Sequence, residues 1–212
     1  MSQSQISDTD LNYPINPANT NLVQGVDNAR VVERLIPVRL SLSVTEAATA
    51  STTAVRAAVT DNGSQQTITT GITNPPFPRN LTATAGGTAT DIKAIAVTVF
   101  GTNEAGEAIQ ETLPAFTVDT AGTVTGNKAF KTVTSIVIPA HDGVGATTAI
   151  GFGDKIGLPH KLTENTVIAS YLNKVKEGTA ATVAISSTAL ESNTVDLNSA
   201  LNGTVVDIDY LV

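Results

Sequence analysis

KAIAVTVFGTNEAGEAIQETLPAF, residues 93–116, is the stretch that decides the fold class. Ile95, Val97 and Val99 alternate with other residues, and a period of two predicts a strand with one buried face. The residues that come next, TNEAGE, are small or polar and predict a turn with Gly106 in the left-handed backbone region. The chain then returns as AIQETLPAF. We therefore predict an antiparallel hairpin near the middle of the chain.

Short alternating stretches flank this hairpin on both sides. We predict further strands over about 31–44, 55–60, 65–70, 79–85, 123–127, 131–138, 147–153, 166–175, 180–187 and 204–212. Three segments have the length of a short helix, but their Thr and Asn content disfavours one: 45–54, 162–176 and 188–201. Many short strands separated by turn residues are typical of sandwiches and barrels. The sequence therefore predicts an all-β fold, an antiparallel β-sandwich or barrel-like domain over residues 26–212.

Glycine and proline mark the connections between these strands. Asn62-Gly63 predicts a tight hairpin between the strands at 55–60 and 65–70. The proline cluster at 74–79 predicts a rigid extended connector, pinned to the domain by Phe77, and a candidate sub-boundary of the domain. The glycines of 151–157 do not form a phosphate loop, because Leu158-Pro159 comes next and no helix can begin there. We expect them at a bulge or a close backbone approach at a sheet edge.

Composition excludes several classes of protein. The chain is 41% hydrophobic but only 4% aromatic, so the core must consist of Val, Ile, Leu and Ala. The net charge is −7, and an acidic surface repels the phosphates of a nucleic acid. There is no cysteine, which excludes disulfides and thiolate sites. No apolar run approaches the ~20 residues of a membrane helix, and the first residues lack the features of a signal peptide, so we expect synthesis in a host cytoplasm without a membrane partner.

The residues that could carry catalysis are few and scattered. His141 and His160 each lie in a predicted loop beside a proline, and no nucleophile motif accompanies them. Asp207 and Asp209 share one face of the last strand and are expected to point to solvent. No calcium-loop pattern is present, and the absence of Trp disfavours a sugar-cleaving cleft. We therefore expect a non-enzymatic protein without cofactor, catalytic site or metal site.

Protein contacts are the remaining candidate function. Residues 1–25 are polar with spaced apolar side chains, and two interpretations stay open: a disordered tail, or an extended arm that lies across a neighbouring subunit. Strand edges with few charges can accept another strand. The end of the chain, 204–212, is either an integral strand or a plug into a partner. We expect contacts from segments 6–23, 74–79 and 139–160, and the candidate contact residues are Ile6, Leu11, Tyr13, Ile15, Leu22, Pro75, Pro76, Phe77, His141 and His160.

The middle of the chain has a recognisable succession of segments. PRNLTAT begins at residue 78, VFGTNEAGEAIQETL spans 99–113, GNKAFKTVTSIVIPA spans 126–140 and IGFGDKIGLPHKL spans 150–162. This succession resembles virion structural proteins of tailed bacteriophages, particularly small head-associated proteins. The resemblance implies a decoration (cement) protein that binds the major capsid protein on the capsid surface and stabilises the head. It carries no functional residues, and a homo-oligomer, with a closed trimer on a local three-fold axis, is the arrangement we expect.

Three alternatives remain open from the sequence. A tail tube, tail terminator or baseplate protein of the same virion is the first, and a tube protein would have a long β-hairpin that completes its neighbour's sheet. A receptor-binding or adhesive β module is the second, and it would have an aromatic-lined groove. A glycan hydrolase is the third, and it would have convergent carboxylates in a cleft.

Overall fold

The structure, a computed structural model, describes residues 36–212. The predicted arm over residues 1–25 and its five candidate contact residues therefore lie outside the described residues. The chain divides into two units, Met1–Ile36 and Pro37–Val212, and the second contains every strand that the structure describes. These strands pair antiparallel throughout, which confirms the predicted all-β class.

The second unit contains fourteen strands and two short 3-10 helices. The strands are β1 (Pro37–Leu42), β2 (Ser51–Thr60), β3 (Gln66–Ile68), β4 (Arg79–Gly87), β5 (Thr98–Thr102), β6 (Ala108–Thr112), β7 (Gly122–Phe130), β8 (Thr132–Ile138), β9 (Ala146–Gly157), β10 (Val167–Leu172), β11 (Val175–Lys176), β12 (Thr182–Ala184), β13 (Thr194–Asp196) and β14 (Val206–Leu211). The helices are η1 (Ala89–Asp91) and η2 (Leu190–Ser192).

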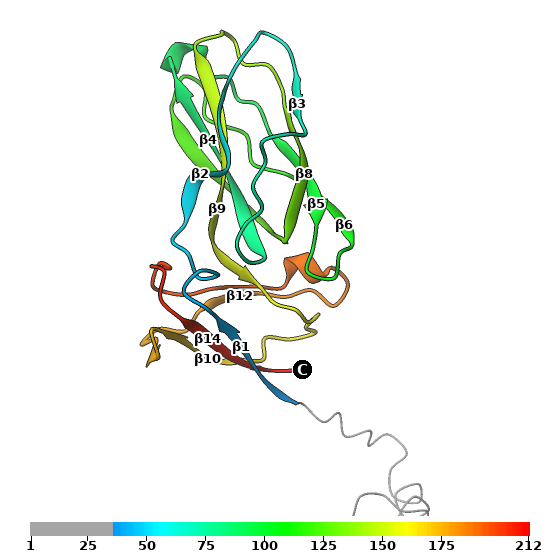
Figure 1. Cartoon of the computed structure of the whole chain (residues 1–212), viewed down its shortest axis with the longest axis vertical. Coiled ribbons are helices and arrows are strands. Elements are labelled where there is room, and N and C mark those ends of the chain that lie inside the picture. Colours follow the sequence, from blue (N-terminus) through cyan, green and yellow to red (C-terminus); the bar gives the residue numbers. More distant parts are fainter. Residues whose placement is uncertain (1–35) are drawn as a thin grey trace, which may run out of the picture. The chain divides into compact units, whose positions relative to one another are not determined.

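These strands form three sheets, and Figure 1 labels most of their strands. The first sheet has the order β1-β14-β10-β11, and the third has the order β3-β8-β5-β6. The second has the order β12-β13-β9-β4-β7, with β2 also paired to β9. The predicted hairpin is confirmed as β5 and β6, and Gly106 in its turn has a φ of 81°.

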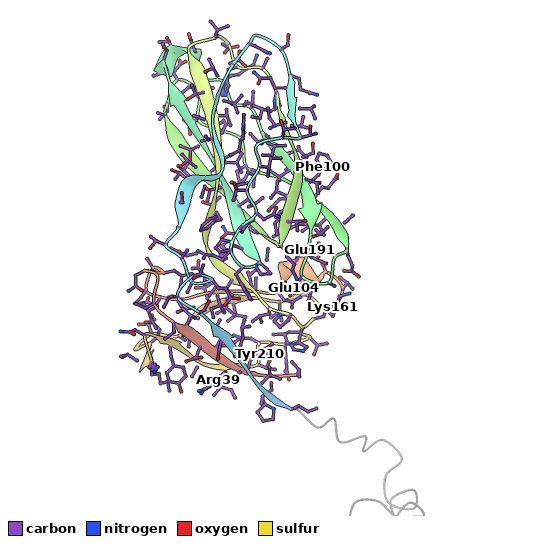
Figure 2. The ribbon with its side chains drawn as sticks, in the orientation of Figure 1. Arg39, Phe100, Glu104, Lys161, Glu191 and Tyr210 are labelled. Carbon is purple, nitrogen blue, oxygen red and sulfur yellow. The ribbon has the colours of Figure 1, made fainter. Side chains whose placement is uncertain are left out.

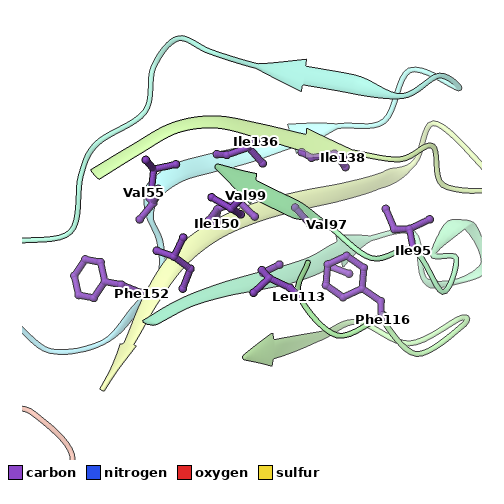
Figure 3. Close-up of a cluster of buried hydrophobic side chains, with 14 of the residues drawn as sticks. Val55, Ile95, Val97, Val99, Leu113, Phe116, Ile136, Ile138, Ile150 and Phe152 are labelled. Carbon is purple, nitrogen blue, oxygen red and sulfur yellow. The ribbon is translucent and has the colours of Figure 1, made fainter. Parts of the chain in front are cut away.

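The first hydrophobic core lies between the second and third sheets, where residues far apart in the sequence meet (Figure 3). Val99 of β5, Ile136 of β8 and Ile150 of β9 are fully buried there. Aliphatic side chains dominate, as the composition predicts, and Phe116, Phe130 and Phe152 are the aromatic members. Two sheets facing each other across this core make a β-sandwich.

A second core joins the first sheet to the end of the second sheet. Ile156 near the end of β9 packs with Val195 of β13 and with Ile208 and Tyr210 of β14. β9 contributes Ile150 to the first core and Ile156 to the second, so one strand supports both cores. The predicted C-terminal strand is therefore an integral element, because β14 pairs with β1 on one side and with β10 on the other.

Several strand boundaries differ from the prediction. β5 begins at Thr98, although Ile95 and Val97 are buried as expected. The backbone there makes isolated bonds, because the N–H groups of Phe116 and Leu113 donate to the carbonyls of Ile95 and Val97. Two of the segments that have the length of a short helix contain no α-helix. Segment 45–54 ends in the first residues of β2, and segment 188–201 contains η2 and β13.

The Asn62-Gly63 prediction is right about the turn and wrong about the hairpin. Gly63 has a φ of 77°, and the side-chain oxygens of Asp61 and Asn62 accept the N–H groups of Gly63 and Ser64. However, β2 pairs with β9 whereas β3 pairs with β8. The turn therefore carries the chain from one sheet to the other, across the sandwich.

The glycines of 151–157 lie in the interior of a sheet and not at its edge. β9 has β4 as a partner, and β2 and β13 are its other partners, so the expected edge position is wrong. The expected close backbone approach is present, because a Cβ at Gly151 would overlap the backbone carbonyl of Ser51. The register between β2 and β9 shifts after this contact. Glycine is needed where β2 crosses β9 too closely for any side chain.

Candidate functional site

His141, a predicted contact residue, is buried. Its ring Nε2 lies 2.9 Å from the hydroxyl oxygen of Thr148, and its Nδ1 accepts the backbone N–H of Lys93 at 3.2 Å. The ring also stacks on Phe116. Burial lowers the pKa of His141, partly opposed by the carboxylates of Asp61 and Asp142. The side chain is 6% exposed, so its prediction as a surface contact does not fit this position, and the residue acts as an internal hydrogen-bonding group.

His160 is half-buried beside the first sheet. Its Nδ1 lies 2.7 Å from the hydroxyl oxygen of Tyr210, a residue of β14 that Figure 2 labels beside Arg39 of β1. Burial raises the pKa of Tyr210 to about 12, so the hydroxyl keeps its proton, and the tautomer of His160 decides whether this hydroxyl donates to the ring nitrogen or accepts from it. His160 therefore fixes the end of β14 while part of its ring stays open to solvent.

The proline connector is only partly exposed. Pro75 is buried, Pro76 is exposed and Phe77 is half-buried against the second core. The expected pinning role of Phe77 is therefore confirmed. Pro76 is the member of this trio whose side chain is available to a partner.

Several charged side chains on the described surface form ion pairs with each other. The Nε of Arg39 on β1 lies 2.6 Å from Asp209 on β14, and this contact lowers the pKa of Asp209. Asp207, on the same face as expected, accepts the hydroxyl of Ser41 at 2.5 Å. Lys131 lies 3.1 Å from Glu104 in the β5–β6 turn. Such mixed pairs form a surface with no block of like charge at these positions.

A hollow of about 240 Å³ lies beside β7, β9 and β13. Lys155 and Asp196 line it, and the amine of Lys155 donates to the side-chain oxygen of Asn127 at 2.6 Å. Burial raises the pKa of Asp196, and the nearby charge of Lys155 opposes this rise. The amine is already bonded to a neutral amide, so the arrangement lacks the nucleophile–base pair that covalent catalysis needs.

A second hollow, of about 260 Å³, runs beside the β10–β11 hairpin. Two of the large apolar side chains most open to solvent belong to this hairpin: Ile168 is 61% exposed and Val175 is 68% exposed. Asn173 and Lys174 connect the two strands with φ angles of 51° and 65°. Exposed apolar groups at an incompletely paired strand are the feature that most resembles a protein-binding surface.

Comparison with known proteins identifies no matching family model, no similar curated protein and no similar solved structure. Among residues 36–212, no three His, Asp or Glu side chains gather closely enough to hold a metal ion. Nor does the described part contain a helix of the length and apolar character needed to cross a membrane.

The exposed hairpin is not apparent from the sequence, because the alternation over 166–175 predicts one strand. Positive φ at two consecutive residues is the signature of a type I′ turn, which Asn-Gly usually supplies. In this chain Asn173 is followed by Lys174, so the usual second residue of the signal is absent. Asn173 is therefore the one residue in this part of the sequence that indicates a turn.

Proposed function

We propose that this chain is a non-enzymatic virion structural protein, and specifically a decoration (cement) protein that binds the major capsid protein and stabilises the head. The resemblance over residues 78–162 supports this proposal, and those residues contribute β4 to β9 of the sandwich. A protein of this kind adds an interface where several capsid subunits meet. Repetition over the shell then multiplies a modest affinity.

The observation that carries the proposal is the combination of exposed apolar groups with unpaired strand edge at the β10–β11 hairpin. Ile168 and Val175 are 61% and 68% exposed although both are large and aliphatic. Single exposed apolar residues are common, but two on one short hairpin beside a hollow favour a binding surface. Such a surface can bind another protein through apolar contact and backbone hydrogen bonds, without a catalytic group.

The β5–β6 hairpin bears on the tail-tube alternative. Each of its strands has five residues, and the turn between them spans residues 103–107. A tube subunit needs a long hairpin that reaches into its neighbour's sheet, and this hairpin is short. The geometry of the described residues therefore favours the decoration role over the tube role.

Imaging of reconstituted particles tests the proposal. Purified full-length protein is mixed with capsids prepared without it, and the particles are examined by electron microscopy. The proposal expects added density at regular positions over the whole shell, and a higher temperature of capsid disruption. Density confined to the tail or one vertex would favour a tail or baseplate role, and absence of binding at any protein concentration would overturn the decoration role.

A matched pair of variants sharpens this experiment. Val175→Asp places a charge on the exposed hairpin, and Val118→Asp places the same charge on a side chain that is 51% exposed elsewhere. Both residues are solvent-exposed, so we expect both variants to fold. Weaker capsid binding by Val175→Asp alone would assign the contact to the hairpin, and equal binding by both would exclude the hairpin from it.

A further inference from the structure

Among residues 36–212, the outer edge of β10 has a partner strand at only two of its residues. On one side β10 pairs with β14 from Val167 to Leu172. On the other side β11 pairs only with Tyr171 and Leu172. The backbone from Val167 to Ser170 therefore has a free edge, apart from the Ser170 carbonyl, which accepts the N–H of Glu177. Unpaired backbone N–H and C=O groups on an edge are a template for another strand.

The hollow beside β10 runs along this free edge. Val167, Ile168, Ala169 and Ser170 all line it, together with the 176–181 segment on the opposite wall. Consecutive residues of a strand cannot line a hollow through their side chains alone, because side chains alternate between its two faces. The hollow is therefore a groove along a strand edge. Its volume of about 260 Å³ lies below the range of ~300–1,000 Å³ that is usual for small-molecule pockets.

The sequence contains a segment with the pattern of an added strand. DLNYPIN, residues 10–16, has Leu11, Tyr13 and Ile15 at alternate positions, so an extended chain presents these three on one face. Pro14 lies between them on the other face. Proline is tolerated in an outermost strand because its missing N–H costs no bond on the solvent side.

Charge and reach favour this segment as the occupant. Residues 1–29 contain three aspartates and no Lys, Arg or Glu, whereas Lys174 and Lys176 are exposed on the β10–β11 hairpin. The nearby Glu177 already accepts the N–H of Ser199. The residues between 16 and 37 span up to about 70 Å when extended, which is enough to reach a neighbouring molecule. Pro37 begins β1, and β1 is the strand at the opposite edge of the same sheet.

We propose that residues 10–16 of one copy of the chain add as a strand along the free edge of β10 in a second copy. Backbone hydrogen bonds to Val167–Ser170 give the affinity, and the alternate apolar side chains meet Ile168 and the groove wall. The aspartates before Leu11 lie toward Lys174 and Lys176. This self-association goes beyond capsid binding and does not require it.

Cysteine cross-linking tests the proposal directly, because the natural chain has no cysteine. Full-length Tyr13→Cys and Ile168→Cys proteins are mixed and oxidised mildly. A disulfide needs Cβ atoms within about 4.5 Å, so it forms efficiently only when the two segments dock. The matched control replaces Ile168→Cys by Val144→Cys, whose position is 65% exposed in the loop before β9. We expect several-fold more mixed dimer with Ile168→Cys than with Val144→Cys.

Hydrogen exchange supplies a readout that does not depend on the register of docking. We expect the amides of residues 167–170 to become more protected as protein concentration rises, and Leu11→Asp to abolish this change. Equal cross-linking with both cysteine partners, together with concentration-independent exchange at these amides, would overturn the proposal. Capsid binding is measured separately, so that result would leave the decoration role untouched.

Discussion

The guanidinium of Arg79, the first residue of β4, donates to the backbone carbonyl of Gly153 in β9 from both its Nε and one of its Nη atoms. It also donates to the carbonyl of Ala48 at 3.0 Å and to the carboxylate of Asp154 at 3.2 Å. The side chain is fully buried, over the ring of Phe152. Burial lowers its pKa to about 10, which still leaves it charged at neutral pH. A buried cation thus ties β4 and β9 to the chain before β2.

We predict that Arg79→Met strongly destabilises the fold. The substitution retains much of the volume but leaves the Gly153 and Ala48 carbonyls and the Asp154 carboxylate without their donor. Removal of one partner from a buried charged network costs about 3 kcal/mol or more. Urea unfolding followed by circular dichroism measures the change.

Arg39→Met is the matched control, because Arg39 is also paired with an aspartate but is exposed to solvent. Exposed ion pairs contribute little. We therefore expect its unfolding midpoint to stay close to that of the natural protein. Similar losses for both variants would contradict a special role for the buried arginine.

Gly151→Ala tests the close approach of β2 to β9. An added methyl group would overlap the backbone carbonyl of Ser51, and two backbones would have to separate. Overpacking of this kind costs about 1–3 kcal/mol, occasionally more. Gly122→Ala is the control, because a Cβ at Gly122 in β7 meets nothing within 4 Å. Thermal unfolding of the two variants should differ clearly, and equal melting temperatures would refute the predicted overlap.

The burial of His141 leads us to predict that the folded protein loses stability in mild acid. Burial lowers its pKa in the folded protein, so the unfolded chain takes up a proton first as the pH falls through about 6.5. Protonation of Nδ1 in the folded state would also set two donors against each other, since Nδ1 accepts the N–H of Lys93. Stability is therefore unaffected by His141 above that pH and decreases below it.

His141→Gln separates this effect from other titrations. We expect the variant to lose less stability than the natural protein between about pH 7 and pH 5.5, whatever its stability at pH 7. His160→Gln serves as the comparison for a half-buried histidine. The measurement is the free energy of unfolding in urea at each pH, and an unchanged pH slope in His141→Gln would show that this imidazole does not control acid stability.

The sequence predicts local structure in this chain better than it predicts strand pairing. Alternation identifies the strand around Val99, and Gly106 takes the expected left-handed turn. Asn62-Gly63 fits equally a hairpin or a passage between sheets, and only the distant strands β8 and β9 decide between the two. The burial of His141 likewise depends on Thr148 and on the amide of Lys93, which come from other segments.

The candidate binding edge depends on distant residues in the same way. Composition predicts strand edges with few charges as contact sites, but it does not identify which strand has an open edge. Within the described residues, most of the outer edge of β10 is open because β11, which follows the turn at Asn173 and Lys174, has two residues. A three-residue strand such as β13 is too short for a periodic signal, so its place beside β9 is not predictable either.

Two Asn-Gly sequences allow a prediction about chemical ageing. Asparagine deamidates when the amide nitrogen of the next residue attacks its side-chain carbon, ammonia leaves and water opens the resulting ring; glycine offers the least obstruction. The N–H of Gly63 donates to the carboxylate of Asp61 at 2.8 Å, whereas the N–H of Gly203 donates to the carbonyl of Ala47 at 3.1 Å. A carboxylate can accept the proton that the attacking nitrogen loses, and a carbonyl cannot.

We therefore predict that Asn62 deamidates faster than Asn202 in the folded protein. Peptide mapping by mass spectrometry after incubation at mildly alkaline pH measures both sites in one sample, so Asn202 is an internal control. In denatured protein both turns are lost and the two rates should converge. Asp61→Asn should slow the reaction at Asn62 in the folded state, because the proton acceptor is removed. Equal folded-state rates at Asn62 and Asn202 would show that the carboxylate of Asp61 has no influence on the attacking nitrogen.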